Sequence, residues 1–140
     1  MPDETLLAFD FGLKRIGVAI GEKRLGTARA LTTINSEINE TRFHAIEQLL
    51  KEWQPARLIV GRPLHEDGSP HELSSRCERF GNQLRGRYRL PVEYVDERFS
   101  SLEAENTLRQ THVAWQERKT KIDAEAAKVI LQSWFQQSSS

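Results

Sequence analysis

The first third of the chain predicts three short β-strands. Apolar residues dominate 6–10, 16–20 and 28–34, and turns that contain glycine separate these segments. In the third segment, Leu31 and Ile34 are expected to face the core. Consecutive short strands joined by tight turns form an antiparallel meander. We therefore expect the chain to begin with three antiparallel strands.

After the meander, the apolar period changes to that of a helix. Apolar residues recur every three or four positions from Thr41 to Trp53, with Asn39 as a candidate N-cap and Pro55 just beyond the end. The apolar segment 57–61 then predicts a strand covered on both faces. The order at this point is three strands, a helix and a strand.

The second half repeats the alternation of helix and strand. Ser69, Pro70 and Glu72 form a helix-start signature, and the helix that follows is expected to bury a set of apolar side chains: Leu73, Cys77, Phe80, Leu84 and Tyr88. The next strand is expected at 92–95. It ends at the acidic pair Asp96-Glu97.

Two helices are expected in the C-terminal third. A capping box at Ser100 predicts a helix through about Arg109. Residues 110–121 show no period and are expected to be a mobile connector. A final helix is expected from about Asp123 to Gln136. The whole order predicts an α/β fold with a mixed five-stranded sheet and helices on its faces, in a single domain over 1–140.

Composition narrows the class of protein. Charged residues make up 29% and hydrophobic residues 38%, and 20 basic residues balance 20 acidic ones, as in an ordinary globular protein. No apolar run approaches the roughly 18 residues of a membrane span, so no membrane association is expected. The single cysteine, Cys77, is expected to be a core residue of a cytoplasmic protein.

Four acidic residues stand where predicted elements start or stop. Asp10 ends the first strand, Asp96 and Glu97 end the last strand, and Asp123 opens the final helix. Small alanines beside Asp123 would let that helix approach the sheet closely. Carboxylates gathered in this way need a cation, and Mg²⁺ prefers oxygen ligands. Two such ions can activate water for phosphodiester hydrolysis.

Each acidic residue also has a plainer interpretation. Asp10 could be a turn residue, and Asp123 could be an acid that favours a helix N-terminus. Glu97 could pair with Arg98 on the surface. The second helix carries an arginine face whose members are Arg76, Arg79, Arg85, Arg87 and Arg89. Such a face is more often solvated than bound to nucleic acid.

Four motifs in this chain resemble those of the YqgF (RuvX) family. They are DFGLKRIGVA at 10–19, IVGRPLHEDG at 59–68, DER at 96–98 and KIDAEAA at 121–127. They occur in the family's order and span nearly the whole chain. One departure is Arg62, which stands where the family usually has leucine.

The resemblance implies a ribonuclease H-like fold and a metal-dependent nuclease. Carried over by motif, the catalytic and metal-binding acids are Asp10, Glu97 and Asp123, with Asp96 as the alternative to Glu97, and the expected cofactor is Mg²⁺ or Mn²⁺, as two ions. The basic residues expected to bind nucleic acid are Lys14, Arg15, Arg62, Arg98 and Lys121.

The expected function is processing of the 5′ end of pre-16S rRNA during ribosome biogenesis. Two alternatives stay open: a Holliday junction resolvase that acts on four-way DNA, and a ribosome-assembly factor that binds rRNA without cutting it. The expected partners are structured RNA or branched DNA, and pre-ribosomal particles. The chain is expected to be a monomer or a weak homodimer.

Overall fold

The computed structural model describes residues 4–63, 72–97 and 115–138, with side chains for 4–62, 74–96 and 123–137. Eight elements lie in these ranges. They are β1 (Thr5–Phe11), β2 (Ile16–Glu22), β3 (Thr27–Ile34), α1 (Asn39–Trp53), β4 (Arg57–Pro63), α2 (Glu72–Tyr88), β5 (Val92–Glu97) and α4 (Trp115–Ser138).

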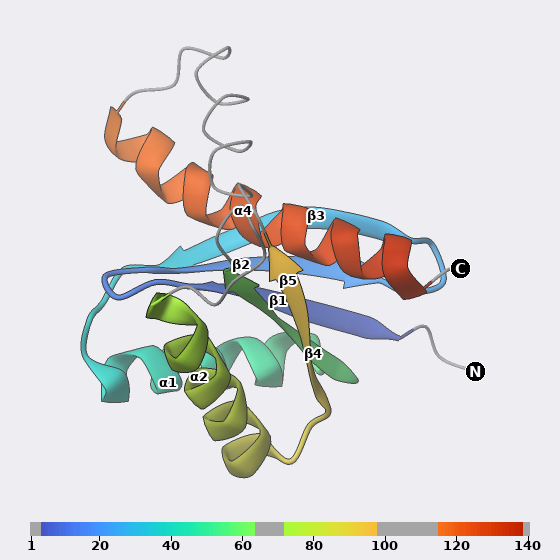
Figure 1. Ribbon diagram of the computed structural model, residues 1–140, viewed down its shortest axis with the longest axis horizontal. Coiled ribbons are helices and arrows are strands. Elements are labelled where there is room, and N and C mark those ends of the chain that lie inside the picture. The colour runs from blue at the N-terminus through green and yellow to red at the C-terminus, as the bar shows by residue number, and fades with distance from the viewer. Residues whose placement is uncertain (1–3, 64–71, 98–114, 139–140) are drawn as a thin grey trace.

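The five strands form one mixed sheet in the order β3-β2-β1-β4-β5. The pairs β1–β2 and β2–β3 are antiparallel, whereas β1–β4 and β4–β5 are parallel. Helices α1 and α2 cover one face of this sheet and α4 crosses the other (Figure 1). This arrangement confirms the predicted mixed five-stranded sheet with helices on both faces.

Strand alternation divides the core into two layers. Along β1, Leu7 and Phe9 pack towards α1 and α2, while Leu6 and Ala8 pack towards α4. All four side chains are fully buried. Because neighbouring residues of a strand face opposite sides of a sheet, this alternation also fixes the side to which any later residue of β1 points.

A β-bulge explains how Leu31 and Ile34 can face the same layer although they are three residues apart. The pairing of β2 with β3 shifts between Val18 and Ala19, which leaves Leu31 without a partner in the register. An extra residue in one strand reverses the alternation beyond it. Ile34 is buried in the layer of α1 and α2, and Leu31 packs against that layer, as the sequence predicted.

Helix α4 lies very close to the sheet. A Cβ atom at Gly61 would overlap the side chain of Ile130, and one at Gly21 would crowd Leu131. At the far end of α4, the Trp134 Nε1 donates a hydrogen bond of 3.3 Å to Glu93 of β5. None of the described helices combines the length and the apolar character needed to cross a bilayer.

A cluster of charged residues, Glu4, Arg57 and Glu93, lies beside the C-terminal half of α4. The Arg57 guanidinium lies 5.7 Å from the Trp134 ring, pairs with Glu93, and lies 3.6 Å from Glu4. These contacts join Glu4, just before β1, and Arg57, the first residue of β4, to β5 and α4. The C-terminal half of α4 is therefore attached to the sheet by polar contacts as well as by apolar packing.

Three local predictions need correction. α1 begins at Asn39, its N-cap is Ile38, and the cap makes no side-chain hydrogen bond. Residues 115–121, expected in a mobile connector, are the first turns of α4. Polar helix formers can start a helix without any apolar period, so periodicity missed this segment. The helix expected at 100–109 lies outside the described residues, as does the start signature at 69–71.

Candidate active site

Asp10 lies on the α4 face of the sheet, near the end of β1. It follows Leu6 and Ala8 in the alternation, and both belong to the core layer under α4. Asp10 pairs with Gly17 across the β1–β2 hairpin, and residues directly opposite in such a pair share a face. The carboxylate of Asp10 therefore projects from the sheet beside the open backbone of Gly17.

Asp123 reaches the same place from α4. A Cβ atom at Gly17 would overlap the backbone carbonyl of Asp123, so the helix backbone rests directly on β2 at this point. Only glycine allows so close an approach. Gly17 thus separates the two acids, with Asp10 beside it on β1 and Asp123 above it on α4.

The position of Asp123 within its helix differs from the prediction. α4 starts at Trp115, so Asp123 lies in the third turn and not in the first. The favourable effect of the helix dipole on an acid is limited to the first turn. The structure therefore removes the helix-dipole explanation for Asp123, and leaves its contact with the sheet and with Arg15.

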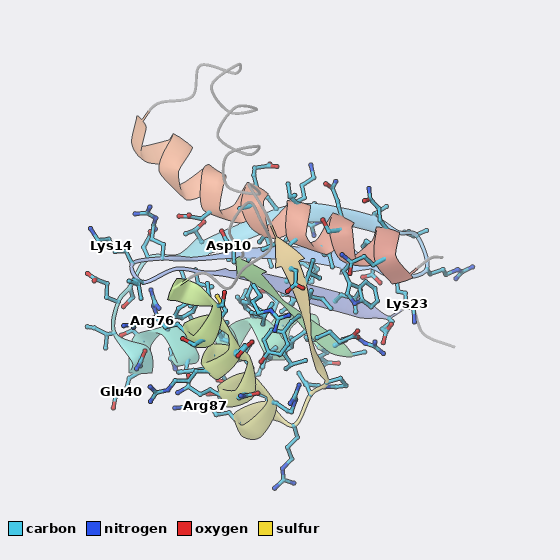
Figure 2. All side chains as sticks on the ribbon, viewed as in Figure 1. Asp10, Lys14, Lys23, Glu40, Arg76 and Arg87 are labelled. Carbon is cyan, nitrogen blue, oxygen red and sulfur yellow. The ribbon has the colours of Figure 1, made fainter. Side chains whose placement is uncertain are left out.

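Arg15 joins the two sides of the site. Its Nε lies 2.5 Å from the Asp123 Oδ2, and both side chains are half-buried. Arg15 comes from the β1–β2 turn, next to the exposed Lys14. Figure 2 shows Lys14 on the hairpin end of the sheet, away from Lys23. The turn therefore supplies one cation in contact with Asp123 and a second, exposed cation next to it in the chain.

Asp96, near the end of β5, is bound by an arginine of the neighbouring strand. Asp96 accepts hydrogen bonds of 2.7 Å from Arg62, whose other nitrogen donates to Glu78 of α2 at 2.8 Å. Arg62 also lies over the Tyr94 ring on the α2 side. Hydrogen bonds to Glu78 and then to Asp96 raise the pKa of Arg62 above its ordinary value. Asp96 therefore has a structural partner on the face opposite Asp10.

The predicted site residues fall into three groups. Asp10, Asp123 and Arg15 lie together at the hairpin end of the α4 face, with the exposed Lys14 next to Arg15 in the turn, whereas Asp96 and Arg62 pair on the other face. A third group lies outside the described side chains: Glu97, whose backbone ends β5, Arg98 and Lys121. Within the described side chains, no cluster of three or more histidine, cysteine, aspartate or glutamate residues is placed to hold a metal.

The two described acids fit a hard divalent cation by their chemistry. Both offer carboxylate oxygens, the ligands that Mg²⁺ and Mn²⁺ take in proteins. They come from different elements that the Gly17 contact holds together. A pair of rigidly placed carboxylates with room for water and phosphate ligands is the usual protein share of such a site.

Arg42 was not singled out from the sequence, although it supports the hairpin that carries Lys14 and Arg15. It is 4% exposed, and its guanidinium donates to the carbonyls of Gly12 and Leu13 at 2.7 Å and to that of Ser36. Desolvation lowers its pKa from the ordinary value. A signal existed, because Arg42 stands one helical turn before the core residue Ile46.

Comparison with known proteins shows which family this chain resembles. Residues 4–137 match the family model of RuvX, described as Holliday junction resolvase. A Burkholderia cenocepacia protein named "Putative pre-16S rRNA nuclease" is 54% identical over 96% of this chain and 91% of its own length. A Burkholderia multivorans protein of the same name is 53% identical over the same shares.

Solved structures of similar fold are far more distant in sequence. Thermus thermophilus RuvC in complex with a Holliday junction substrate has a TM-score of 0.57 at 16% identity, covering 96% of this chain and 94% of that one. Fowlpox virus resolvase with Holliday junction DNA has a TM-score of 0.56 at 10% identity, covering 96% and 98%. These likenesses confirm the ribonuclease H-like fold.

Proposed function

Because the chain belongs to the RuvX family, we propose that it is a metal-dependent nuclease that hydrolyses phosphodiester bonds of precursor 16S rRNA. The observation that carries the proposal is the meeting of Asp10 and Asp123 across Gly17. Two acids on separate rigid elements, beside two cations of one turn, suit a site that holds a metal and a phosphate together. We also propose a cytoplasmic location, since the one thiol, Cys77, is free and buried.

We propose Asp10, Glu97 and Asp123 as the residues that hold Mg²⁺ or Mn²⁺. Such ions, when bound, activate a water and stabilise the leaving oxygen. Glu97 is preferred to Asp96 because Asp96 follows Val95, which packs under α4, and so lies on the face of the sheet opposite Asp10. Asp96 is already paired with Arg62.

The basic residues of the hairpin turn have a separate task in this proposal. Lys14 is exposed and forms no ion pair within the described part of the chain, so it can meet the phosphate backbone directly. Arg15 is paired with Asp123, and a bound cation at Asp123 would release its guanidinium towards phosphate. Arg62 is better assigned to the support of β5, because two carboxylates already hold it.

The first prediction concerns Asp10. Asp10→Asn keeps the shape of the side chain and removes its negative charge, so cleavage of a precursor 16S rRNA in Mg²⁺ should fall by at least about a hundredfold. Asp96→Asn is the matched control, one acid removed on the opposite face, and it should cleave at nearly the rate of the unmodified protein. Equal cleavage by Asp10→Asn and the unmodified protein would refute the mechanism.

A second candidate function is resolution of four-way DNA junctions, which the description of the matching family model favours. Resolvases cut two strands in step and act as symmetric dimers. Incubation of the protein with a four-way DNA junction and with precursor rRNA, in Mg²⁺ and in EDTA, shows which of the two substrates is cleaved.

Sedimentation of the protein with the junction then shows whether one or two copies bind. Binding to pre-ribosomal particles without cleavage would favour the assembly-factor alternative.

A further inference from the structure

A pocket of about 570 Å³ lies between α1 and α2, on the face of the sheet opposite α4. Its size is in the range of sites for small organic ligands. Phe11 lines it, and Phe11 directly follows Asp10 on β1. Because alternation puts these two residues on opposite faces, the pocket and the candidate active site lie on the two sides of one strand end.

The pocket is positively charged. Of the described residues that line it, three are arginines and none is an aspartate or glutamate. Arg42 is occupied by backbone carbonyls. Arg76 and Arg79 are exposed, and within the described chain neither forms an ion pair. Two guanidinium groups are thus available for an anion, and guanidinium matches phosphate with paired hydrogen bonds.

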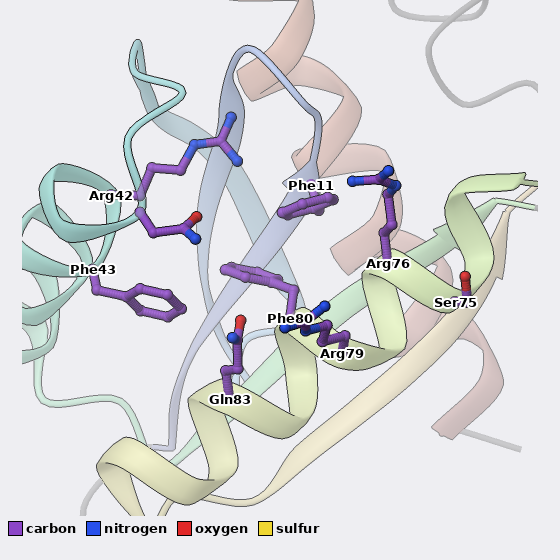
Figure 3. A pocket seen from close by; sticks show the side chains of 9 residues that line it. Phe11, Arg42, Phe43, Ser75, Arg76, Arg79, Phe80 and Gln83 are labelled. Atoms are coloured by element: carbon purple, nitrogen blue, oxygen red, sulfur yellow. The ribbon is translucent and has the colours of Figure 1, made fainter.

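The other side of the pocket is aromatic. The half-buried Phe11 ring lies 5.0 Å from the buried Phe80 ring, and the Arg42 guanidinium lies 5.5 Å from the Phe11 centroid. In Figure 3, Phe11 stands between Arg42 and Arg76, and Gln83 rises from α2 on the same side as Phe80. An aromatic face beside free guanidinium groups can bind a base and a phosphate at once.

We propose that this pocket binds an unpaired nucleotide of the strand whose neighbouring phosphate lies at Asp10. The proposal rests on the nuclease function proposed above and deepens it. The base stacks on Phe11, and Arg76 and Arg79 hold the phosphate that follows it. A base inside a duplex cannot reach such a ring, so the preferred substrate has single-stranded nucleotides beside the cleaved bond.

The test measures binding apart from cleavage. Fluorescence anisotropy in EDTA gives the Kd of a short labelled RNA single strand over a range of salt concentrations. For Arg76→Ala/Arg79→Ala we expect weaker binding and a slope of log K against log salt that is smaller by about two. Phe11→Leu should weaken binding by about fivefold or more. The matched control is Lys23→Gln/Arg24→Gln, two charges removed in the β2–β3 turn, with binding retained. Figure 2 shows Lys23 at the opposite end of the sheet from Lys14.

Three results overturn the inference: the arginine pair variant binds the single strand like the unmodified protein, a fully paired duplex binds as tightly as the single strand, or a free nucleoside monophosphate binds as tightly as the strand. The last result would assign the pocket to a free nucleotide. The nuclease proposal fails separately, if Asp10→Asn leaves cleavage unchanged. Loss of binding in the arginine variant would still support the pocket in that case.

Discussion

Two acids near the strand ends, Asp123 and Asp96, each pair with an arginine from another element. Asp123 of α4 pairs with Arg15 of the hairpin turn, and Asp96 of β5 pairs with Arg62 of β4. The first pair joins two residues predicted for different tasks, metal binding and phosphate binding. At the proposed metal site, Arg15 and a metal ion would therefore compete for the Asp123 carboxylate.

The prediction at this residue is that Arg15→Gln makes metal binding easier and cleavage slower. A half-buried ion pair of this kind is worth up to about 1 kcal/mol, so the Mn²⁺ concentration that gives half-maximal thermal stabilisation should fall by about two- to fivefold. Cleavage should fall because a phosphate contact is lost. Lys23→Gln, at the far end of the sheet, should change neither quantity. An unchanged Mn²⁺ midpoint would contradict the competition.

The environment of Cys77 keeps its thiol protonated and therefore unreactive. It is fully buried on α2, and burial, with smaller contributions from the charges of Asp10 and Glu78, raises its thiol pKa from 9.0 to about 12. The predicted role of Cys77 as a core residue is confirmed. Because the thiolate is the reactive form, this cysteine is unreactive in the folded protein.

A thiol reagent tests this directly. At a pH near 9, where an ordinary thiol is half ionised, the native protein should react with it far more slowly than the denatured protein. The folded protein holds this proton more tightly, so the contribution of Cys77 to stability is complete below pH 9 and is lost as the pH rises from about 9 to about 12. Cys77→Val should lack this part of the alkaline decline. Equal reaction rates for native and denatured protein would exclude the burial argument.

At the scale of elements, the distance between α4 and the sheet decides whether the acids meet. That distance is set by glycines of the sheet, above all by Gly17, which lies under the Asp123 carbonyl. The sequence pattern placed Gly17 within the second predicted strand and attributed the close approach to the alanines beside Asp123. Both contribute, but the backbone contact of a glycine with a helix more than a hundred residues later is a tertiary fact that no local pattern contains.

The prediction for this contact is Gly17→Ala. The added methyl group has no space against the α4 backbone, so α4 must shift, with a cost of about 1–3 kcal/mol in the free energy of unfolding and a loss of cleavage from the displaced Asp123. Urea denaturation and the rRNA assay measure the two effects. Gly86→Ala is the control: its Cβ meets open space in α2, and the change should stabilise by up to about 1 kcal/mol. Similar results for both variants would contradict the contact.

For the whole molecule, the strands could be predicted because each carries a local apolar pattern, and the antiparallel meander of the first three followed from their short connections. The start of α4 could not be predicted, because 115–121 is helical although it carries no apolar period. Asp123 was rightly brought to the sheet but placed in the wrong turn. Arg42 was overlooked because its function, holding carbonyls of a distant turn, depends on tertiary contacts.

The fold depends on α4 to cover one whole face of the sheet. Six of the described side chains of α4 are buried: Ala124, Ala126, Ala127, Ile130, Leu131 and Trp134. The last four belong to the core layer between α4 and the sheet. The three large ones alone contribute about 1.5–3 kcal/mol each, which is comparable to the 5–15 kcal/mol stability of a typical domain. A chain that ends before Trp115 should therefore show no cooperative thermal transition by circular dichroism. A chain that lacks only 139–140 should melt normally, and equal melting of both would refute this dependence.

The contact of Trp134 with Glu93 also affects the position of Asp123, although it lies at the opposite end of the sheet. Apolar packing alone does not fix the position of a helix along a sheet, because a slide of one turn, about 5.4 Å, would still bury apolar groups. Two unlike attachments forbid that slide: Asp123 to Arg15 at one end, and Trp134 to Glu93 at the other. They lie 11 residues apart, roughly 16 Å along the axis. Trp134 thus fixes the position of α4 along the sheet, and it keeps the Asp123 carboxylate, about three turns away, opposite Arg15 of the β1–β2 turn.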